Sequence, residues 1–328
     1  MKILFVHNSP TKFVQIDHVL LRERYEVHEW YQHSRVVNLA KLMQAVTDCD
    51  LVFGWFASWH TFFPVLFAQA LGRPSTLVVG GYDVAKMSGI RYGNQCGGFK
   101  QWVSRRSIHN ANALVTFSEF SRREALQNAN AKPSRTHLVY LGVQACDQPL
   151  LRKEDLILTV GNVDSGTLYR KGLLSFVQAA SFMPQISFLL IGRWRDNTIN
   201  YLKQIASPNV QFLNWVDDIK LNDYLSRARV YVQASLHEGF GLSVAEAMLH
   251  KCVPVVTRAG SLPEVVGECG VYIDSTDPRA VALGIRHALT CDDRAGQNAH
   301  ERIIAEFPLE RRRAQLFKLI DELLKSHG

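Results

Sequence analysis

Short apolar runs alternate with helix-length segments along the whole chain. In the first half the apolar runs are residues 2–8, 25–30, 51–55, 75–80, 113–118 and 137–142, and in the second half they are residues 156–161, 186–192, 210–215, 230–235, 253–257 and 271–273. Helical patterns lie between most of them, for example over residues 35–47, 97–110 and 119–129. Continuous apolar strands separated by helices indicate parallel sheets that are covered on both faces. Two such sets predict an α/β chain with two doubly wound domains.

The two sets of strands are separated by a polar segment, QACDQPLLRK, at residues 144–153. It contains Pro149 and precedes a new apolar run, so we expect the domain boundary there. The last segment, residues 308–325, has leucine and isoleucine at helical spacing and predicts an amphipathic terminal helix. The chain has 328 residues, which is enough for two domains of ordinary size.

The composition is that of a globular protein, with 47% hydrophobic and 20% charged residues. The first apolar run is too short for a signal peptide. The six cysteines show neither a CxxC pair nor the spacing of a zinc site, which predicts free thiols and a cytoplasmic location. Residues 51–71 carry no charge and are long enough to span a bilayer, but they contain polar residues and Pro64. We interpret them as a buried strand followed by a helix.

The net charge of +7 is confined to the first half of the chain. Residues 1–146 contain 16 Lys and Arg against 9 Asp and Glu, whereas the remainder contains 21 of each kind. Basic pairs and aromatic residues interleave there, namely Arg105-Arg106, Arg122-Arg123, Phe99, Trp102 and Phe120. Two interpretations stay open: a solvated basic surface with the aromatic residues in the core, or a half that meets an anionic membrane or a lipid-diphosphate acceptor.

Motifs for dinucleotides, P-loop phosphates or metal ions are absent or incomplete. There is no GxGxxG, and residues 161–166 have P-loop glycine spacing but are followed by Thr167 where the lysine is needed. Asp48 and Asp50 form a DxD pair that precedes a strand, whereas ligands of such sheets bind beyond the carboxyl ends of the strands. We therefore expect no metal site and no bound cofactor.

Two glutamates flank a glycine loop at residues 236–256, LHEGFGLSVAEAMLHKCVPVV. Glu238 lies in the loop that leaves a predicted strand, and Glu246 lies in the helix that follows. Glycines let backbone approach a ligand, and the free N–H groups of a helix start attract an anion. Carboxylates accept hydrogen bonds from hydroxyl groups, so the pair suits a nucleotide sugar, with one carboxylate for sugar hydroxyls and the other for ribose hydroxyls. The alternative for Glu246 is a carboxylate that stabilises the helix dipole.

A second phosphate-binding element is expected after the strand at residues 156–161. Arg170 and Lys171 precede Gly172 and open a predicted helix there. Two cations at a helix start oppose its dipole, which an anion bound at that place explains. The alternative is a pair of solvated surface cations.

These motifs together resemble the retaining GT-B glycosyltransferases of family GT4, the group 1 enzymes. The resemblance covers most of residues 154–328 and rests on EGFGLSVAEAM (238–248), PVV (254–256) and GSLPEVV (260–266), in that order. The first half is similar more loosely, through VVGGYD (78–83) and TFSEFSRREAL (116–126). The resemblance implies two domains that face a cleft, with the acceptor bound by the first and the donor by the second.

The resemblance also implies roles for individual residues. Glu246 holds the ribose, Glu238 holds the transferred sugar, and Lys171 with Arg170 neutralises the departing diphosphate. The other donor-side candidates are Gly239, Phe240, Gly241 and Leu242, whose backbone N–H groups meet the diphosphate and sugar, together with Gly161, Asn162 and Val216. Acceptor-side candidates at strand ends of the first domain are Asn8, His60, Tyr82 and Asp83, although a lone histidine such as His60 is more often structural. Base recognition is expected near residues 215–218.

The chain departs from the family pattern at three places. Asn162 stands where the family usually has an arginine after the glycine, and Arg170 is the candidate replacement for that charge. His7-Asn8-Ser9-Pro10 replaces the glycine pair after the first strand, and Gly80 replaces a histidine before Gly-Tyr-Asp. These departures affect the acceptor side and the usual histidine contact to the donor sugar.

We therefore expect a retaining hexosyltransferase that uses a UDP or GDP sugar and no metal. The expected parts are an acceptor domain at 1–148, a nucleotide-sugar domain at 149–307 and a helix at 308–328 that packs back on the first domain. The acceptor is a glycan, a lipid-linked sugar or a small molecule, peripheral contact with an anionic membrane stays open, and no nucleic acid is expected. Two alternatives remain, another GT-B enzyme such as an epimerase or phosphorylase, and a catalytically silent subunit that binds a nucleotide sugar.

Overall fold

A computed structural model describes residues 1–144 and 151–327 of the chain. It divides into two compact units, unit 1 formed by Met1–Gly142 with Leu309–Gly328, and unit 2 formed by Val143–Pro308. The predicted boundary between residues 148 and 149 lies outside the described residues. The terminal helix belongs to unit 1, as the resemblance implies.

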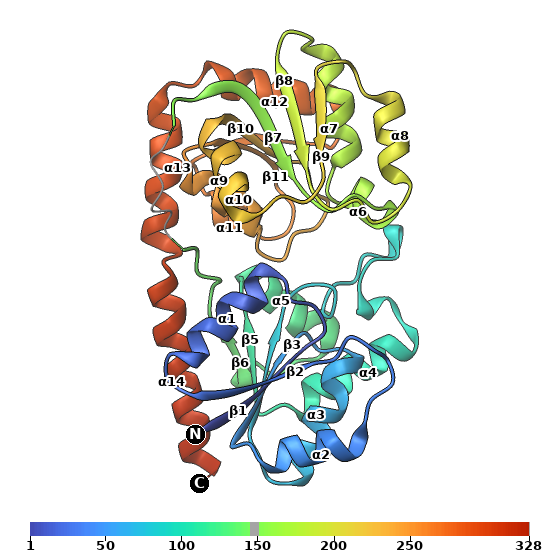
Figure 1. The fold of residues 1–328 in the computed structure, drawn as a ribbon, viewed down its shortest axis with the longest axis vertical. Helices are drawn as coiled ribbons and strands as arrows, with labels where there is room; N and C mark the ends of the chain where they lie inside the picture. Colours follow the sequence, from blue (N-terminus) through green and yellow to red (C-terminus); the bar gives the residue numbers. More distant parts are fainter. Residues whose placement is uncertain (145–150, 328) are drawn as a thin grey trace. The chain divides into compact units, whose positions relative to one another are not determined.

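Unit 1 is built on a six-stranded parallel sheet in the order β2-β1-β3-β4-β5-β6 (Figure 1). Its strands are β1 (Lys2–His7), β2 (Glu26–Tyr31), β3 (Leu51–Trp55), β4 (Ser75–Val79), β5 (Ala113–Thr116) and β6 (Thr136–Leu138). The central strands β3, β4 and β5 are buried along their whole length, which matches their continuous apolar sequence.

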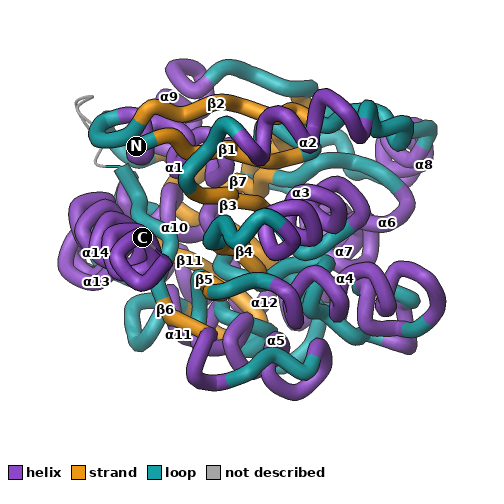
Figure 2. Tube along the Cα trace, turned by 90° about the horizontal axis from the view of Figure 1, so that it is seen from below, coloured by secondary structure: helices purple, strands orange, loops and turns teal. Residues whose placement is uncertain are grey.

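Helices cover both faces of this sheet. They are α1 (Lys12–Arg22), α2 (Leu39–Thr47), α3 (Trp59–Ala70), α4 (Gly98–Asn110), α5 (Glu119–Ala129) and α14 (Leu309–His327), with 3-10 turns η1 (Ser88–Ile90), η2 (Asn94–Cys96) and η3 (Pro133–Arg135). The connection from β1 to β2 moves toward one edge of the sheet, and every later connection moves toward the other edge. Because such crossovers are right-handed, α1 lies on one face of the sheet and α2 to α5 lie on the other. Figure 2 shows α14 on the side of the strands opposite α2, α3 and α4, so the terminal helix fills the face that α1 cannot cover alone.

A buried ion pair fixes α14 on α1. The Arg312 guanidinium donates to both carboxylate oxygens of Asp17 at 2.6 and 2.7 Å, and both side chains are inaccessible to solvent. Its remaining nitrogen donates to the carbonyl oxygens of Val139 and Tyr140. Such a bidentate pair with satisfied donors sets the register of two helices.

Unit 2 repeats the design with the strand order β12-β11-β10-β7-β8-β9. Its strands are β7 (Glu154–Val160), β8 (Ser187–Ile191), β9 (Val210–Leu213), β10 (Ala228–Gln233), β11 (Val253–Thr257) and β12 (Val271–Ile273). Its helices are α6 (Ser165–Arg170), α7 (Leu173–Ala179), α8 (Thr198–Ile205), α9 (Asp218–Arg227), α10 (Leu242–Leu249), α11 (Leu262–Val266), α12 (Pro278–Thr290) and α13 (Asp293–Glu306), with the 3-10 turn η4 (Ala180–Phe182). The prediction of two doubly wound domains is confirmed.

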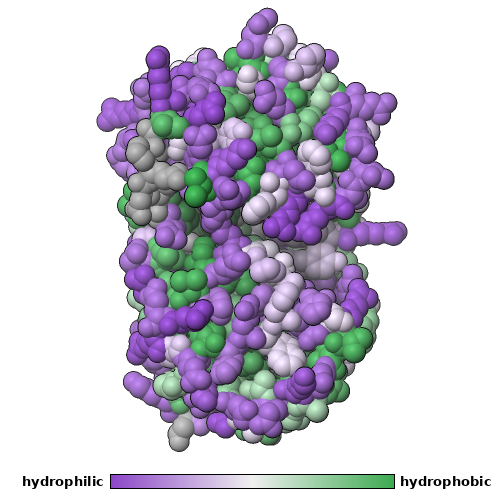
Figure 3. All heavy atoms as spheres, viewed as in Figure 1, coloured by the Kyte–Doolittle hydropathy of each residue, from purple (hydrophilic) through white to green (hydrophobic). Residues whose placement is uncertain are grey.

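The uncharged stretch at residues 51–71 forms β3 and α3, as predicted. Within the described parts of the chain, no helix combines the length and the apolar character needed to cross a membrane. On the face drawn in Figure 3, hydrophilic and hydrophobic side chains are interspersed.

Candidate functional site

The strand order of unit 2 reverses between β7 and β10. From β7 the chain moves outward through β8 and β9, and from β10 it moves the other way through β11 and β12. In open α/β sheets a ligand binds beyond the carboxyl ends of the strands at such a reversal. The loops that leave β7 and β10 contain most of the predicted donor-side residues, so the topology gathers them at one sheet edge.

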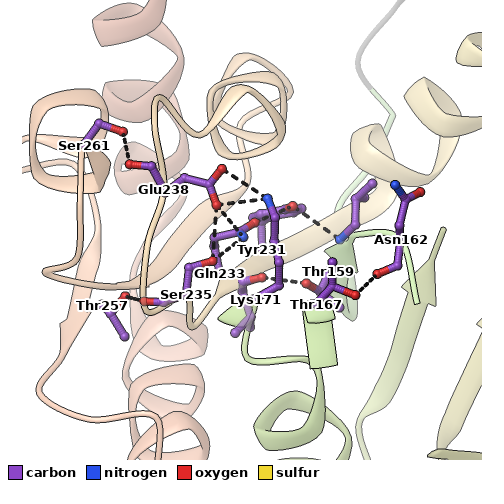
Figure 4. A network of polar contacts seen from close by, with 12 residues as sticks. Thr159, Asn162, Thr167, Lys171, Tyr231, Gln233, Ser235, Glu238, Thr257 and Ser261 are labelled. Atoms are coloured by element: carbon purple, nitrogen blue, oxygen red, sulfur yellow. Dashed lines mark hydrogen bonds and ion pairs between the residues drawn. The ribbon is translucent and has the colours of Figure 1, made fainter. Parts of the chain in front are cut away.

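Lys171 and Glu238 meet at this edge (Figure 4). The Lys171 ammonium donates to Glu238 Oε2 at 2.9 Å and to Oε1 at 3.1 Å. The two side chains keep 20% and 13% of their surface exposed, so the pair is largely desolvated but still reachable by a ligand. The structure therefore brings together the predicted diphosphate-binding cation and the predicted sugar-binding carboxylate.

The backbone around Lys171 is fixed by close packing against the β10 loop. Gly172 has φ +67°, and a Cβ atom there would lie 2.2 Å from the Ala234 carbonyl oxygen. The Leu236 N–H donates to the Arg170 carbonyl at 2.8 Å. Any side chain at residue 172 would push the two loops apart, so glycine is required for the Lys171–Glu238 approach.

The prediction that Arg170 and Lys171 open a helix holds only in part, because they lie between two helices. Arg170 is the last residue of α6, Lys171 is its C-cap, and α7 begins only at Leu173. Cations at the C-terminus of α6 stabilise its dipole, and this offsets the unfavourable position of Lys171 directly before Gly172, the N-cap of α7. The case for an anion at this place rests instead on the position of Lys171 at the sheet edge and on its pairing with Glu238.

A polar network lies behind Glu238. Gln233 Nε2 donates to Ser235 Oγ at 2.7 Å and to Glu238 Oε2 at 3.3 Å, and Ser235 Oγ also lies 3.3 Å from that oxygen. The Tyr231 hydroxyl donates to Gln233 Oε1 at 3.1 Å. These residues orient the carboxylate from the buried side and leave Lys171 on the other.

Electrostatics keep Glu238 charged. Burial alone would raise the pKa of this carboxyl, but the adjacent Lys171 ammonium, with smaller contributions from Arg170 and His237, lowers the pKa below its usual value. Its backbone is held as well, because the Ser261 N–H and hydroxyl both donate to the Glu238 carbonyl at 3.0 Å. Glu238 is thus an anion at neutral pH in a fixed position.

Helix α10 starts beside this pair without a capping side chain. Its N-cap is Gly241, which has φ +92° and no side chain with which to cap the first turn. Phe240 is buried against the Phe307 ring, so only its backbone faces the loop. Glu246 is half-buried one turn into the helix. The pKa of Tyr231 is raised mainly by burial, and the negative charges of Glu238 and Glu246 raise it further. Uncapped N–H groups and two carboxylates therefore share one region, as predicted from the sequence.

The remaining donor-side candidates lie in the loops after β7 and β9. Gly161 follows β7 and approaches the β8 loop closely, since a Cβ atom on Gly192 would lie 1.9 Å from the Gly161 carbonyl oxygen. Asn162 is exposed, and Val216 is half-buried in the loop between β9 and α9. Next to it, the Arg193 guanidinium lies 5.2 Å from the centre of the exposed Trp215 ring.

Sequence reasoning missed the network residues Tyr231, Gln233 and Ser235. A signal was present, because the three polar residues alternate with apolar ones in VYVQAS and therefore share one face of a buried strand. Polar side chains on a buried strand face need partners, which marks a site at the strand's end.

The acceptor-side candidates lie in unit 1 and differ in accessibility. Asn8 is half-buried in the loop after β1, and Tyr82 is 40% exposed in the loop after β4 with its ring against Tyr92. Both positions are at carboxyl ends of strands, where ligands of such sheets bind.

Asp83 and His60 are buried and engaged in local structure. The N–H groups of Ala57, Gly80 and Gly81 donate to the Asp83 carboxylate, and burial raises the pKa of Asp83 to about 6 against their effect. His60 Nε2 lies 2.8 Å from the Trp55 carbonyl oxygen, and burial lowers the pKa of His60 to about 4. In this structure neither side chain presents a group to an acceptor, which leaves Asn8 and Tyr82 as the accessible candidates.

Asp48 and Asp50 lie at the amino end of β3, as the sequence predicts. Asp48 accepts from the Gln44 side chain and Asp50 from the Lys2 N–H. Across residues 1–144 and 151–327, no three His, Cys, Asp or Glu side chains are grouped as metal ligands.

Comparison with known proteins agrees with this geometry. Residues 154–291 match the family model of glycosyl transferases group 1. The chain is 31% identical over 209 residues to the O-antigen chain mannosyltransferase B of Escherichia coli, a match that covers 57% of this chain and 54% of that protein. It is 27% identical over 251 residues to the alpha-maltose-1-phosphate synthase of Mycolicibacterium smegmatis, with 64% of each chain covered. The chain thus spans between half and two thirds of the length of these curated relatives.

A solved structure shares the fold over the full length. HepE of Anabaena, in complex with UDP and glucose, matches with a TM-score of 0.77 and 16% identity, over 98% of this chain and 100% of that chain. The predicted GT-B class is confirmed by this likeness and by the two six-stranded sheets. The chain therefore has the GT-B fold, and its residues 154–291 are similar to the group 1 glycosyltransferases.

Proposed function

We propose that the protein is a glycosyltransferase that moves a hexose-type sugar from a UDP or GDP sugar to a sugar acceptor. The observation that carries the proposal is the Lys171–Glu238 pair beside the uncapped start of α10, at the strand-order reversal of unit 2. The match of residues 154–291 to the group 1 family supports it, and the mannosyltransferase relative supports a hexose as the transferred group.

Each part of the donor has a matching group in unit 2. The diphosphate meets the N–H groups at the start of α10 and the Lys171 ammonium, which have the polarity and position that an anion requires. Glu246 accepts from the ribose hydroxyls, and Glu238 accepts from hydroxyls of the transferred sugar. The base lies toward Val216, beside the exposed Trp215.

The reaction breaks the bond between the sugar C1 and the oxygen of the diphosphate and forms a bond from C1 to an acceptor hydroxyl oxygen. The proton of that hydroxyl passes to the departing diphosphate. We propose attack on the face from which the diphosphate leaves, with retention of configuration. Lys171, Arg170 and the N–H dipoles stabilise the charge that develops on the diphosphate, so no metal ion is required in this scheme.

The acceptor binds to unit 1 in this proposal. Asn8 and Tyr82 lie at carboxyl ends of β1 and β4 and offer hydrogen-bonding groups to sugar hydroxyls. The two curated relatives are named for a polysaccharide chain and for a sugar phosphate, so both glycans and small sugars are candidate acceptors.

A thermal-shift screen tests the donor assignment first. UDP, GDP, ADP and their sugars are each added to the protein, and a ligand at 100 times its dissociation constant raises the free energy of unfolding by about 2.7 kcal/mol. The donor so identified is then incubated with and without sugar acceptors, and the products are analysed by NMR for the anomeric configuration.

The outcomes separate the alternatives. Release of nucleoside diphosphate that depends on an acceptor, with a retained anomer, supports the proposal. Conversion of the donor without acceptor indicates an epimerase, and binding without turnover against every acceptor indicates a silent subunit. Failure of every nucleotide to stabilise the protein contradicts the donor site itself.

A further inference from the structure

Helix α4 carries a stripe of aromatic and basic side chains that faces solvent. Phe99, Trp102, Arg106 and His109 follow one another at spacings of three, four and three residues, so they share one helical face about 15 Å long. Phe99 is 74% and Trp102 54% exposed, and their rings stack with centroids 5.7 Å apart. Of the two interpretations left open by the sequence, packing in the core does not hold for Phe99 and Trp102. Figure 3 shows hydrophobic side chains among hydrophilic ones at the lower right, over the region of α3 and α4.

The basic end of this stripe enters a cavity of about 390 Å³ in unit 1. Its lining includes four cationic side chains and two histidines, namely Arg73, Arg106, Lys132, Arg135, His109 and His327. No carboxylate is among its lining residues. Arg73 lies two residues before the start of β4, and Arg135 lies directly before the start of β6. The cavity therefore lies at the amino edge of the sheet, whereas Asn8 and Tyr82 lie at the carboxyl edge.

The cations of this cavity have no acidic partners among the described residues. Arg73 donates to the Thr47 carbonyl at 3.2 Å, and Arg135 makes only long contacts of 3.5 Å with the carbonyls of His109 and Ala111. Arg106 and Lys132 are exposed and make no ion pair there. Four unpaired positive charges around one hollow repel one another, and an anion with several oxygens relieves that repulsion.

We propose that this surface docks unit 1 on a membrane, with the phosphate group of an anionic lipid in the basic cavity and the Phe99–Trp102 pair in the interfacial layer. Arginine binds phosphate oxygens in pairs, and exposed tryptophan favours the boundary between headgroups and water. A free phosphate compound would leave the exposed aromatic end of the stripe without a contact. Nucleic acid is a poorer match, because each of the two rings already covers one face of the other. This proposal does not depend on the glycosyltransferase assignment.

Vesicle sedimentation tests it on the full-length protein. The vesicles are pure phosphatidylcholine or its mixture with phosphatidylglycerol, at low and at high salt. We expect binding to the anionic vesicles at low salt and release as salt screens the charges. Arg106→Ala/Lys132→Ala weakens binding by about fivefold for each cation removed. Phe99→Ser/Trp102→Ser weakens binding to the anionic vesicles without changing its salt dependence.

The matched control is Arg35→Ala/Lys41→Ala, which removes the same charge from exposed positions of unit 1 outside the cavity. The proposal predicts a much smaller loss for this control. Equal losses in the two double variants would show a non-specific charge effect and overturn the site. Absence of wild-type binding to anionic vesicles at low salt also overturns it. If inorganic pyrophosphate or single-stranded RNA binds the protein through Arg106 and Lys132 while vesicles do not, the cavity serves that ligand and the membrane proposal is wrong.

Discussion

The Lys171 ammonium lies 2.9 and 3.1 Å from the two carboxylate oxygens of Glu238, across the point where the sheet of unit 2 reverses its strand order. This arrangement gives each charge a partner in the protein before a ligand is present. A diphosphate that binds at the start of α10 adds a second anion for Lys171. In the proposed function Glu238 is then free to accept from sugar hydroxyls, and the pair would link donor binding to the orientation of both side chains.

Replacement of Lys171 tests its part in the reaction. Lys171→Ala removes the cation that offsets charge on the departing diphosphate, and we expect turnover to fall on the order of 100-fold. Lys318→Ala is the control, because that lysine side chain is 78% exposed on α14 of unit 1. Turnover of the wild type is measured with and without excess chelator. Strict dependence on added Mg²⁺ or Mn²⁺ would contradict the proposed mechanism and return attention to Asp48 and Asp50.

The buried Arg312–Asp17 pair predicts a large loss of stability when one partner is removed. Arg312→Met leaves an unpaired buried carboxylate, and we expect the free energy of unfolding to fall by about 3–5 kcal/mol. Urea denaturation measures the change. The double variant Arg312→Met/Asp17→Leu recovers part of the loss, because no charge is then left buried without a partner.

Arg313 provides the matched control on the same helix. Its contact with Glu23 joins side chains that are 35% and 41% exposed, so Arg313→Met costs about 1 kcal/mol or less. If Arg312→Met and Arg313→Met destabilise the protein equally, the buried pair does not hold α14 in place.

The lowered pKa of the buried His60 side chain predicts that the free energy of unfolding decreases in mild acid. Its pKa is about 4 in the folded chain against 6.5 for an unperturbed histidine, so the unfolded chain binds the proton more readily between these values. Stability from this group is therefore fully present above pH 6.5 and is lost as pH falls toward 4, on the order of 2 kcal/mol at pH 4.5. His60→Gln keeps an N–H for the Trp55 carbonyl but does not titrate. Urea denaturation at pH 7.5 and 4.5 is expected to show a smaller acid loss in the variant, and identical losses would refute the assignment.

The fold followed from the sequence more completely than the site did. Every apolar run became a strand because buried parallel strands need continuous apolar residues, and this signal is local. The short helix α6 has six residues, too few for a periodic pattern, so the sequence does not show that a helix ends at Arg170 before the next one starts after Gly172. The burial of Arg312 could not be predicted from the sequence for another reason. An arginine on an amphipathic helix is normally placed on the solvent side, and only its tertiary partner Asp17 explains its burial.

The site residues also show that contacts between distant parts of the chain are not predicted by local sequence patterns. EGFGLSVAEAM located Glu238 and Glu246 because glycines and carboxylates around a helix start have a local physical meaning. The contact between Glu238 and Lys171 joins residues far apart in the chain, and it depends on the left-handed Gly172 next to Ala234. No spacing rule predicts such a contact. The alternation of Tyr231, Gln233 and Ser235 was the one sequence signal for the network behind Glu238.

Calorimetric titration of the bare nucleoside diphosphate into Glu246→Gln and Glu238→Gln tests the central claim most directly. In the proposed function Glu246 binds the ribose and Glu238 binds the transferred sugar, so only the Glu246 variant loses a contact to the nucleotide. We expect Glu246→Gln to weaken binding of the preferred nucleotide by about tenfold or more, because a hydrogen bond to a charged group is worth roughly 1.5–3 kcal/mol. Glu238→Gln is expected to bind the bare nucleotide nearly as well as the wild type. Equal losses in the two variants, or no binding of UDP or GDP to the wild type, would contradict the account.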